Sequence, residues 1–255
     1  MTILSIIDSN DLYGKERANL NVDHLLKSNG FDVVVLINTH ANDKVRKEVN
    51  PFRHYDVRFP RNIKGKYRVW LYLKYFCLTI KEVRRVLTLE RPDYVLVPTE
   101  IALSYLYMAF IGMDTKVVFR CGDSPLVYRK KGLAMNIYSF LWRQMICKRV
   151  DKLVCNAKFL MKQMAESGYK IKEADSVIYN YPPDRVAVDD WAVYANHSGM
   201  LRIGFMGRIV PDKGVLELCK AATRLYAEGY RAAYYIAGDM PYGGGCPRTL
   251  TQDSH

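Results

Sequence analysis

The sequence predicts an α/β protein built on a parallel sheet that helices cover on both faces. Short apolar runs rich in Val and Ile alternate along the chain with longer segments of helical period. These apolar runs are continuous rather than alternating, which is typical of strands buried on both faces of a parallel sheet. Because crossovers between parallel strands are right-handed, this order predicts a doubly wound, Rossmann-like sheet.

The first domain is expected to span residues 1–183, with strands and helices in alternation. We expect strands at Ile3–Ile7, Asp32–Ile37, Tyr94–Val97, Lys116–Arg120, Lys152–Cys155 and Ser176–Ile178. We expect helices at Glu16–Ser28, Tyr67–Leu87, Ile101–Ile111, Leu133–Arg149 and Lys158–Ser167. These elements are sufficient for one complete α/β domain.

A second, smaller unit is expected after a break in the pattern. The cluster Asn180-Tyr181-Pro182-Pro183-Asp184 ends the first domain, because proline fixes φ and restricts the residue before it. Residues 184–200 are polar and aperiodic and are interpreted as a linker. In residues 201–255 the pattern predicts a strand at Leu201–Met206, a helix at Val215–Glu228 and a strand at Ala232–Ala237. A single βαβ unit cannot cover both faces of its sheet, so this second Rossmann-like domain is expected to be incomplete.

Composition and charge restrict the class of protein. The 255 residues are 49% hydrophobic and 25% charged, and the formal net charge of +12 favours anionic partners. The first strand lacks the basic region and cleavage site of a signal peptide, and no run of about 20 apolar residues is present. The six cysteines have no C-x-x-C spacing and are interpreted as reduced core thiols. These features indicate a cytoplasmic protein.

The loop after the strand Leu201–Met206 is the most informative motif. It places Gly207, Arg208 and Lys213 between a buried strand and the start of a helix. Helix N-termini attract phosphate through free N–H groups and the helix dipole, while Arg and Lys add charge-assisted contacts. The pattern therefore favours binding of a diphosphate. The alternative is that both cations are solvated on an exposed loop without a ligand.

This loop, Phe205 to Gly214, resembles the F-x-G-R-x-x-x-x-K-G signature of retaining glycosyltransferases of family four, which have the two-domain GT-B fold. The resemblance implies that Arg208 and Lys213 bind the diphosphate of a nucleotide-sugar donor, UDP- or GDP-linked, and that the backbone of Gly207 lines the cleft. It also implies catalysis without a metal or other cofactor.

Two segments of the first domain resemble the same family. Leu12-Tyr13-Gly14-Lys15-Glu16 is similar to its G-G-x-E loop; Tyr13 replaces the first glycine, so only Gly14 carries over as a cleft residue. After the strand near residue 120, relatives have a His-Asp pair where this chain has Gly122-Asp123, which makes Asp123 the catalytic candidate on the acceptor side. The alternatives are an ordinary strand-to-helix turn and a strand-end Asp turn.

The resemblance implies transfer of a sugar, with retention, to a polysaccharide or lipid-linked acceptor. The family also carries two glutamates seven residues apart in its donor domain, and no such pair follows Asp239. We therefore expect the chain to be C-terminally truncated and weakly active or inactive by itself. The alternative is a non-catalytic fragment that docks on a membrane or a partner. A sugar-nucleotide epimerase of the same architecture is disfavoured by the form of the diphosphate loop.

The segment from Arg61 to Arg91 is basic and aromatic. It contains nine Lys or Arg against two Glu, interleaved with Tyr67, Trp70 and other aromatic residues. Two interpretations stay open: a helix that lies on the anionic inner face of a membrane, or a core helix with a solvated basic face. We expect no nucleic-acid partner, because no recognisable nucleic-acid-binding motif accompanies the charge.

Overall fold

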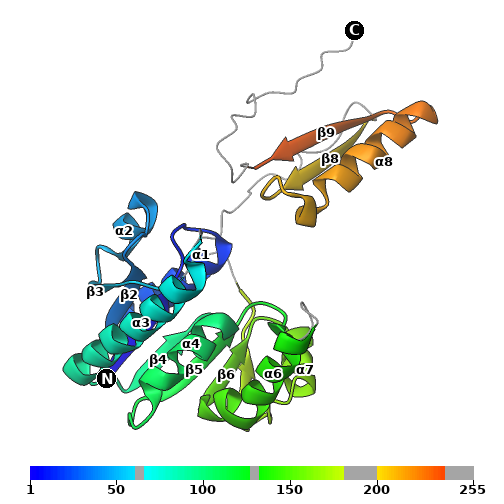
Figure 1. Cartoon of the computed structure of the whole chain (residues 1–255). Helices are drawn as coiled ribbons and strands as arrows, with labels where there is room; N and C mark the ends of the chain where they lie inside the picture. The colour runs from blue at the N-terminus through cyan, green and yellow to red at the C-terminus, as the bar shows by residue number, and fades with distance from the viewer. Residues whose placement is uncertain (61–65, 127–131, 181–199, 239–255) are drawn as a thin grey trace. The chain divides into compact units, whose positions relative to one another are not determined.

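The chain folds into two compact units, Met1–Asp184 and Arg185–His255 (Figure 1). The computed structural model describes residues 1–60, 66–126, 132–180 and 200–238. The predicted linker, residues 184–200, lies outside the described residues except for Met200. Its limits therefore stay a prediction, and each unit is described by itself.

The first unit contains a seven-stranded sheet in the order β3-β2-β1-β4-β5-β6-β7, and every neighbouring pair is parallel. Its strands are β1 (Thr2–Ile7), β2 (Asp32–Asn38), β3 (Arg53–Val57), β4 (Tyr94–Val97), β5 (Lys116–Cys121), β6 (Lys152–Cys155) and β7 (Ser176–Val177). The order reverses direction between β1 and β4. Such a switch point opens a crevice at the carboxyl edge of a parallel sheet, where ligands of this fold class bind.

The helices cover the two faces of this sheet unequally. They are α1 (Gly14–Ser28), α2 (Asp43–Val49), α3 (Arg68–Glu90), α4 (Glu100–Phe110), α6 (Leu133–Leu141) and α7 (Lys158–Glu166). One hydrophobic cluster joins β1 and β2 to α1 and α2. The other joins all seven strands to α3, α4, α7 and the residues that follow α6. Right-handed crossovers explain this division, because the strand order runs one way through α1 and α2 and the other way from α3 onward.

The predicted α/β class is confirmed, and the structure corrects three details. It adds α2 and β3, which the sequence analysis did not predict. The strand β3 lies at the sheet edge and reads Arg-His-Tyr-Asp-Val, so it has no continuous apolar run to reveal it. The helix predicted at Leu133–Arg149 ends at Leu141 and continues as a π turn (Trp142–Ile146) and a 3₁₀ turn (Cys147–Arg149).

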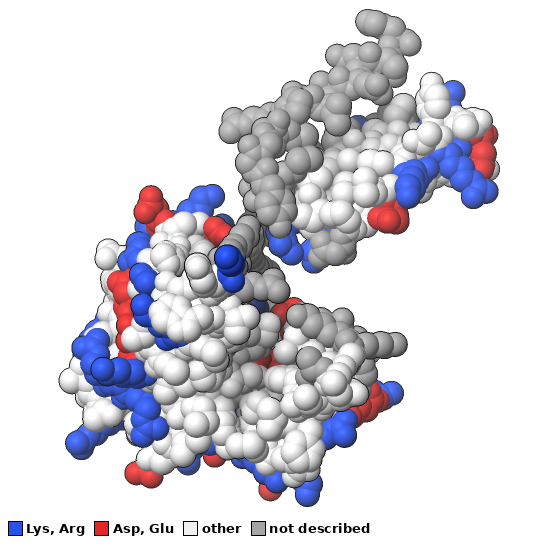
Figure 2. All heavy atoms as spheres, in the orientation of Figure 1, with Lys and Arg blue, Asp and Glu red and all other residues white. Residues whose placement is uncertain are grey.

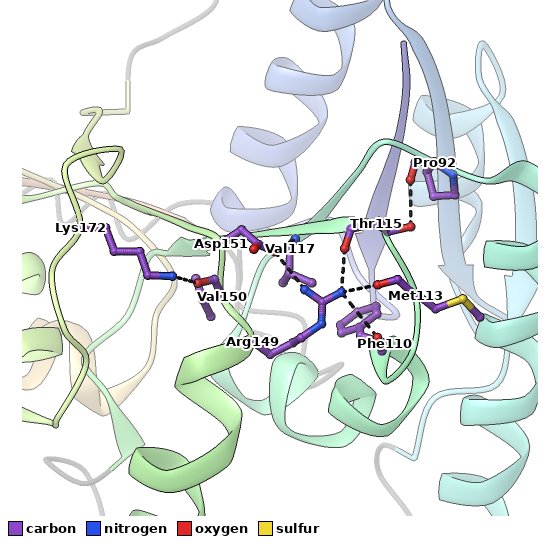
Figure 3. A network of polar contacts seen from close by, with 9 residues as sticks. All are labelled: Pro92, Phe110, Met113, Thr115, Val117, Arg149, Val150, Asp151 and Lys172. Carbon is purple, nitrogen blue, oxygen red and sulfur yellow. Dashed lines mark hydrogen bonds and ion pairs between the residues drawn. The ribbon is translucent and has the colours of Figure 1, made fainter.

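The guanidinium group of Arg149 links the end of α4 to the amino edge of the sheet (Figure 3). Arg149 Nη2 donates to three carbonyl oxygens, those of Phe110 (3.5 Å), Met113 (3.2 Å) and Thr115 (2.7 Å). Its Nη1 lies 2.9 Å from Oδ2 of Asp151, which also accepts a 2.7 Å hydrogen bond from the backbone of Val117. These bonds satisfy the carbonyl of Phe110, the last residue of α4, and two carbonyls of the turn that follows the helix.

The second unit contains the predicted βαβ arrangement. Strand β8 (Leu201–Met206) pairs in parallel with β9 (Ala232–Ala237), and α8 (Val215–Ala227) connects them after a 3₁₀ turn at Pro211–Lys213. Gly238, at φ 156°, closes the unit against the carbonyl oxygen of Gly207, where an added Cβ would lie only 1.8 Å away. Only a glycine fits this approach without movement of the backbone.

Among the described residues, no helix combines the length and hydropathy needed to cross a bilayer. The interpretation of the cysteines as core thiols holds for Cys121, Cys147 and Cys155 and is wrong for Cys77 and Cys219, which are exposed. Cys77 lies on α3 and Cys219 on α8. Cys246 lies outside the described residues.

Candidate functional site

The structure brings Gly14 and Asp123 together at the carboxyl edge of the seven-stranded sheet. Both line a cavity of about 180 Å³, with Lys15, Asn19, Arg120 and Asn180 among the other lining residues. Gly14 begins α1, and Asp123 follows β5. These residues are more than 100 positions apart in the sequence and meet only because parallel strands end at one edge.

The start of α1 is built mainly by local hydrogen bonds. Glu16 is buried, and its carboxylate accepts a 3.3 Å hydrogen bond from the backbone N–H of Tyr13. Glu16 therefore caps the N-terminus of α1, which agrees with the alternative that this segment is an ordinary strand-to-helix turn. The space in front of Gly14 is open, since no protein atom lies within 4 Å of an added Cβ. A side chain at position 14 would therefore occupy part of the cavity without contacting other protein atoms.

A second cavity, of about 210 Å³, adjoins the first and shares Lys15, Gly122 and Asp123 with it. Its floor includes Glu100, the first residue of α4, which is buried. The Glu100 carboxylate accepts 2.7 Å hydrogen bonds from the backbone of Leu126 and from the hydroxyl of Tyr138. Glu100 thus fixes the loop after β5, so its role in this network is structural.

Asp123 itself is exposed at the mouth of both cavities. The thiol of Cys121 donates to its backbone oxygen at 3.3 Å, which anchors the turn. The hydrogen bond with Cys155 and burial together raise the pKa of Cys121, so this thiol stays protonated. An added Cβ at Gly122 would lie 3.7 Å from Nδ2 of Asn156, an ordinary contact. The turn therefore tolerates a side chain where relatives have His.

Arg120 lines the candidate site, and the sequence predicted it only as part of a strand, without a role. Its Nη1 donates to the backbone oxygen of Ala18 (2.8 Å) and to Oδ1 of Asn19 (2.6 Å), and its Nη2 donates to Oδ1 of Asn180 (2.9 Å). Burial lowers the pKa of its guanidinium, while the nearby Asp23 opposes that effect. A half-buried Arg next to the last residue of a largely apolar strand was the signal available in the sequence.

The predicted diphosphate loop lies in the second unit. Arg208 and Lys213 are both exposed; Arg208 lies before the 3₁₀ turn that precedes α8, and Lys213 is the last residue of that turn. Gly214 caps α8 with φ 79°, and Glu217 lies in the first turn of the helix. The backbone N–H of Gly207 is bonded to the oxygen of Ala237 at 3.0 Å. The loop thus presents two cations beside the positive end of a helix.

The two sets of predicted residues belong to different units: Gly14 and Asp123 to the first, Gly207, Arg208 and Lys213 to the second. A larger cavity, of about 580 Å³, lies at the amino edge of the first sheet and contains none of them. The candidate site is therefore chosen by its place at the carboxyl edge, where ligands of this fold class bind, and not by the volume of the cavity. Within the described part of the chain, no cluster of three or more His, Cys, Asp or Glu side chains is arranged to hold a metal ion.

Three solved structures share this fold at low sequence identity. Anabaena HepE in complex with UDP-glucose has a TM-score of 0.58 at 14% identity, over 93% of this chain and 69% of that one. A glycosyltransferase from Rickettsia africae has a TM-score of 0.61 at 18% identity, over 93% and 60%. The lipopolysaccharide outer core galactosyltransferase WaaB has a TM-score of 0.58 at 15% identity, over 93% and 68%. No curated protein matches the sequence.

The family comparison is more specific than the fold. The family described as Glycosyltransferase Family 4 matches residues 14–181, which begin at the predicted cleft glycine and end beside Asn180. That stretch covers well over half of the 255 residues. The chain therefore belongs to glycosyltransferase family 4 and is a transferase with the Rossmann-like architecture of GT-B enzymes.

Proposed function

We propose that the protein transfers a sugar from a UDP- or GDP-sugar to a polysaccharide or lipid-linked acceptor, with retention of anomeric configuration. The observation that carries the proposal is the loop before α8, which displays Arg208 and Lys213 at a helix N-terminus. HepE, which shares the fold, was crystallised with UDP-glucose and with UDP, which supports a nucleoside diphosphate as the group bound.

In this reaction the bond between the anomeric carbon and the diphosphate breaks, and a bond to an acceptor oxygen forms on the same face of the sugar. Negative charge develops on the leaving diphosphate, and Arg208 and Lys213 would stabilise it. Asp123 would accept a hydrogen bond from the acceptor hydroxyl in the cavity beside Gly14. Each role is a proposal for this chain.

An anionic membrane surface is the proposed location of a lipid-linked acceptor, on the cytoplasmic face. Helix α3 changes character along its length: Val83, Val86 and Leu87 are buried, whereas Val69 is 69% and Trp70 62% exposed. The core interpretation thus fits its second half, and the surface interpretation fits its first. Figure 2 shows Lys and Arg gathered where Figure 1 places α3, beside a broad surface without charged side chains. Membrane contact through the first half would combine aromatic insertion with basic charge.

The experiment is a single-turnover assay with enzyme in excess over a radiolabelled UDP- or GDP-sugar, in the presence of lipid-linked acceptors in vesicles. Excess enzyme makes even one slow transfer per enzyme molecule detectable. A product with the donor's anomeric configuration, assigned by proton NMR, supports the proposal, and an inverted product contradicts it. If no sugar moves although nucleotide binds, the non-catalytic docking module becomes the better account.

A further inference from the structure

Two buried thiols lie side by side at the carboxyl edge of the seven-stranded sheet. Cys121 is the last residue of β5 and Cys155 the last residue of β6, and the two are direct partners in the parallel register. Both are free thiols, with 3% and 0% of their surface exposed. Register partners project to the same face of a sheet, and both cysteines belong to one hydrophobic cluster. Their side chains are therefore neighbours.

The spacing of the two residues fits a disulfide. Neighbouring strands lie about 4.7–4.9 Å apart, and the Cα atoms of disulfide-bonded cysteines are usually about 4.4–6.8 Å apart. Closing the bond brings the Cβ atoms to about 3.8 Å, so one strand end must shift slightly. The end of β5 is free to do so, because the pairing of β4 with β5 ends at Phe119 and Cys121 lies beyond that point.

The two thiols also influence each other chemically. The hydrogen bond between them lowers the pKa of Cys155 and raises the pKa of Cys121. Cys155 is therefore the first of the pair to ionise, and the thiolate is the form of cysteine that attacks an oxidant. Cys121 lines the cavity of about 210 Å³ that also contains Asp123. A small oxidant in this cavity lies next to the pair.

Cys147 is buried in a different setting. Its Sγ lies 3.5 Å from the backbone oxygen of Arg143 and 4.0 Å from that of Gly168. Burial raises its pKa. Cys147 precedes β6, whereas Cys155 ends that strand. It is therefore a control within the same chain for the effect of burial without the register pairing.

We propose that Cys121 and Cys155 form a redox-active dithiol that peroxide oxidises to a disulfide, and that this oxidation loosens the turn of Asp123. The Cys155 thiolate attacks one peroxide oxygen, so an S–O bond forms and the O–O bond breaks. The hydroxide released takes up the proton that Cys155 had lost and becomes water. The Cys121 sulfur then attacks the sulfenic sulfur, so the S–S bond forms and the S–O bond breaks. The Cys121 proton leaves with that hydroxide as a second water, and peroxide has gained the two electrons that the thiols lost.

The proton lost from Cys121 has a structural role. The Cys121 thiol donates it to the backbone oxygen of Asp123 at 3.3 Å, and a disulfide has no proton to donate. The turn keeps a second attachment, from the backbone N–H of Leu126 to Glu100 at 2.7 Å. Oxidation should therefore loosen residues 122–124 while Leu126 stays attached. This effect on the turn does not depend on sugar transfer, so its test is separate from that of the proposed function.

The first measurement identifies the disulfide by mass spectrometry. It uses the whole chain with Cys77→Ser/Cys219→Ser/Cys246→Ser, which keeps the three thiols described as buried. After treatment with excess hydrogen peroxide and blocking of the remaining thiols, trypsin should release Cys121 in residues 121–129 and Cys155 in residues 153–158. These two peptides should be linked, with the loss of two hydrogen atoms, and a thiol reductant should separate them. Cys147 should be recovered as a blocked thiol.

The second measurement is amide hydrogen exchange at residues 122–124. Exchange should become about three- to tenfold faster in the oxidised chain. Cys121→Ala removes the same donor without a bridge and should exchange as fast without peroxide. Cys155→Ala keeps the donor but cannot form the bridge, so it should exchange slowly with or without peroxide.

Either measurement can overturn the proposal. It is overturned if Cys121 and Cys155 stay unlinked under excess peroxide, or if either is linked to Cys147 as often as to the other. It is also overturned if the linked chain exchanges at residues 122–124 as slowly as the reduced chain. The mass measurement leaves the pair itself unsubstituted, so it holds even where an alanine variant is unstable.

Discussion

Arg120 Nη2 donates a 2.9 Å hydrogen bond to Oδ1 of Asn180. The bond connects β5 to the C-terminal end of the first unit. The same guanidinium holds α1 through Ala18 and Asn19, next to the cavity that contains Gly14 and Asp123. One side chain therefore joins the helix that begins at the candidate site to the segment that leads toward the second unit. This contact gives Asn180 a structural role.

Replacing Arg120 should destabilise the first unit more than replacing Asn180. Arg120→Met leaves the oxygens of Ala18 and Asn19 without their donor, which should cost about 1–3 kcal/mol, whereas Asn180→Ala removes one bond at an exposed position and should cost less than about 1 kcal/mol. Urea unfolding followed by circular dichroism measures both. Arg17→Met, at an exposed position of α1, is the control. Equal losses from Arg120→Met and Arg17→Met would contradict the assigned role.

Stability should depend on pH through Asp23. Burial raises the pKa of its carboxyl from 3.8 to about 7, against the opposing effects of the Ser5 hydrogen bond and the Arg120 charge. Between about pH 4 and pH 7 the folded protein keeps a proton that the unfolded chain releases, so stability falls as pH rises through this window. The shift corresponds to at most about 4 kcal/mol.

The variant Asp23→Asn should remove that dependence, because an amide keeps the shape and the acceptor for Ser5 but does not titrate. Urea midpoints at pH 5, 6, 7 and 8 compare it with the wild type. Asp114→Asn, at an exposed position just before β5, should follow the wild-type profile. A wild-type midpoint that rises between pH 5 and pH 7 relative to Asp23→Asn would show that Asp23 is not protonated in the fold.

Much of the architecture could be predicted because its signals are local. The strands β4, β6, β8 and β9 match their predicted bounds, since each is a short apolar run between turn residues. The strand β3 could not be predicted, because an edge strand with polar alternation has no such run. The hydrogen bonds of Arg120 could not be predicted either, because its partners lie about 100 and 60 residues away in the sequence and only the folded sheet brings them together.

Gly238 should be indispensable to the second unit. A Cβ at this position would lie 1.8 Å from the backbone oxygen of Gly207, and φ 156° is unfavourable for other residues. Gly238→Ala should therefore destabilise the pairing of β8 with β9 by about 1–3 kcal/mol, measured as faster amide hydrogen exchange in both strands. Gly204→Ala, in β8, places its Cβ in open space and should have little effect on exchange. Unchanged protection in Gly238→Ala would mean that the two strand ends are not held as described.

We expect the first half of α3 to bind anionic membranes. Trp70 is 62% exposed, and Nζ of Lys74 lies 5.4 Å from its ring centroid, so the two form an aromatic and basic pair. Trp70→Ser should reduce binding to vesicles with anionic headgroups about tenfold, measured by co-sedimentation. Leu89→Ser, an equally exposed apolar position near the other end of α3, is the control. Equal binding by both variants would favour a helix whose basic face is only solvated.

The most direct measurement of the central claim is isothermal titration of the chain with UDP and with GDP. Arg208→Ala and Lys213→Ala should each weaken the preferred nucleotide by roughly ten- to a hundredfold, since a charge-assisted contact contributes on the order of 1.5–3 kcal/mol. Lys220→Ala, an exposed lysine further along α8, should bind like the wild type. Nucleotide binding that none of these substitutions changes would contradict the assignment of the diphosphate to this loop.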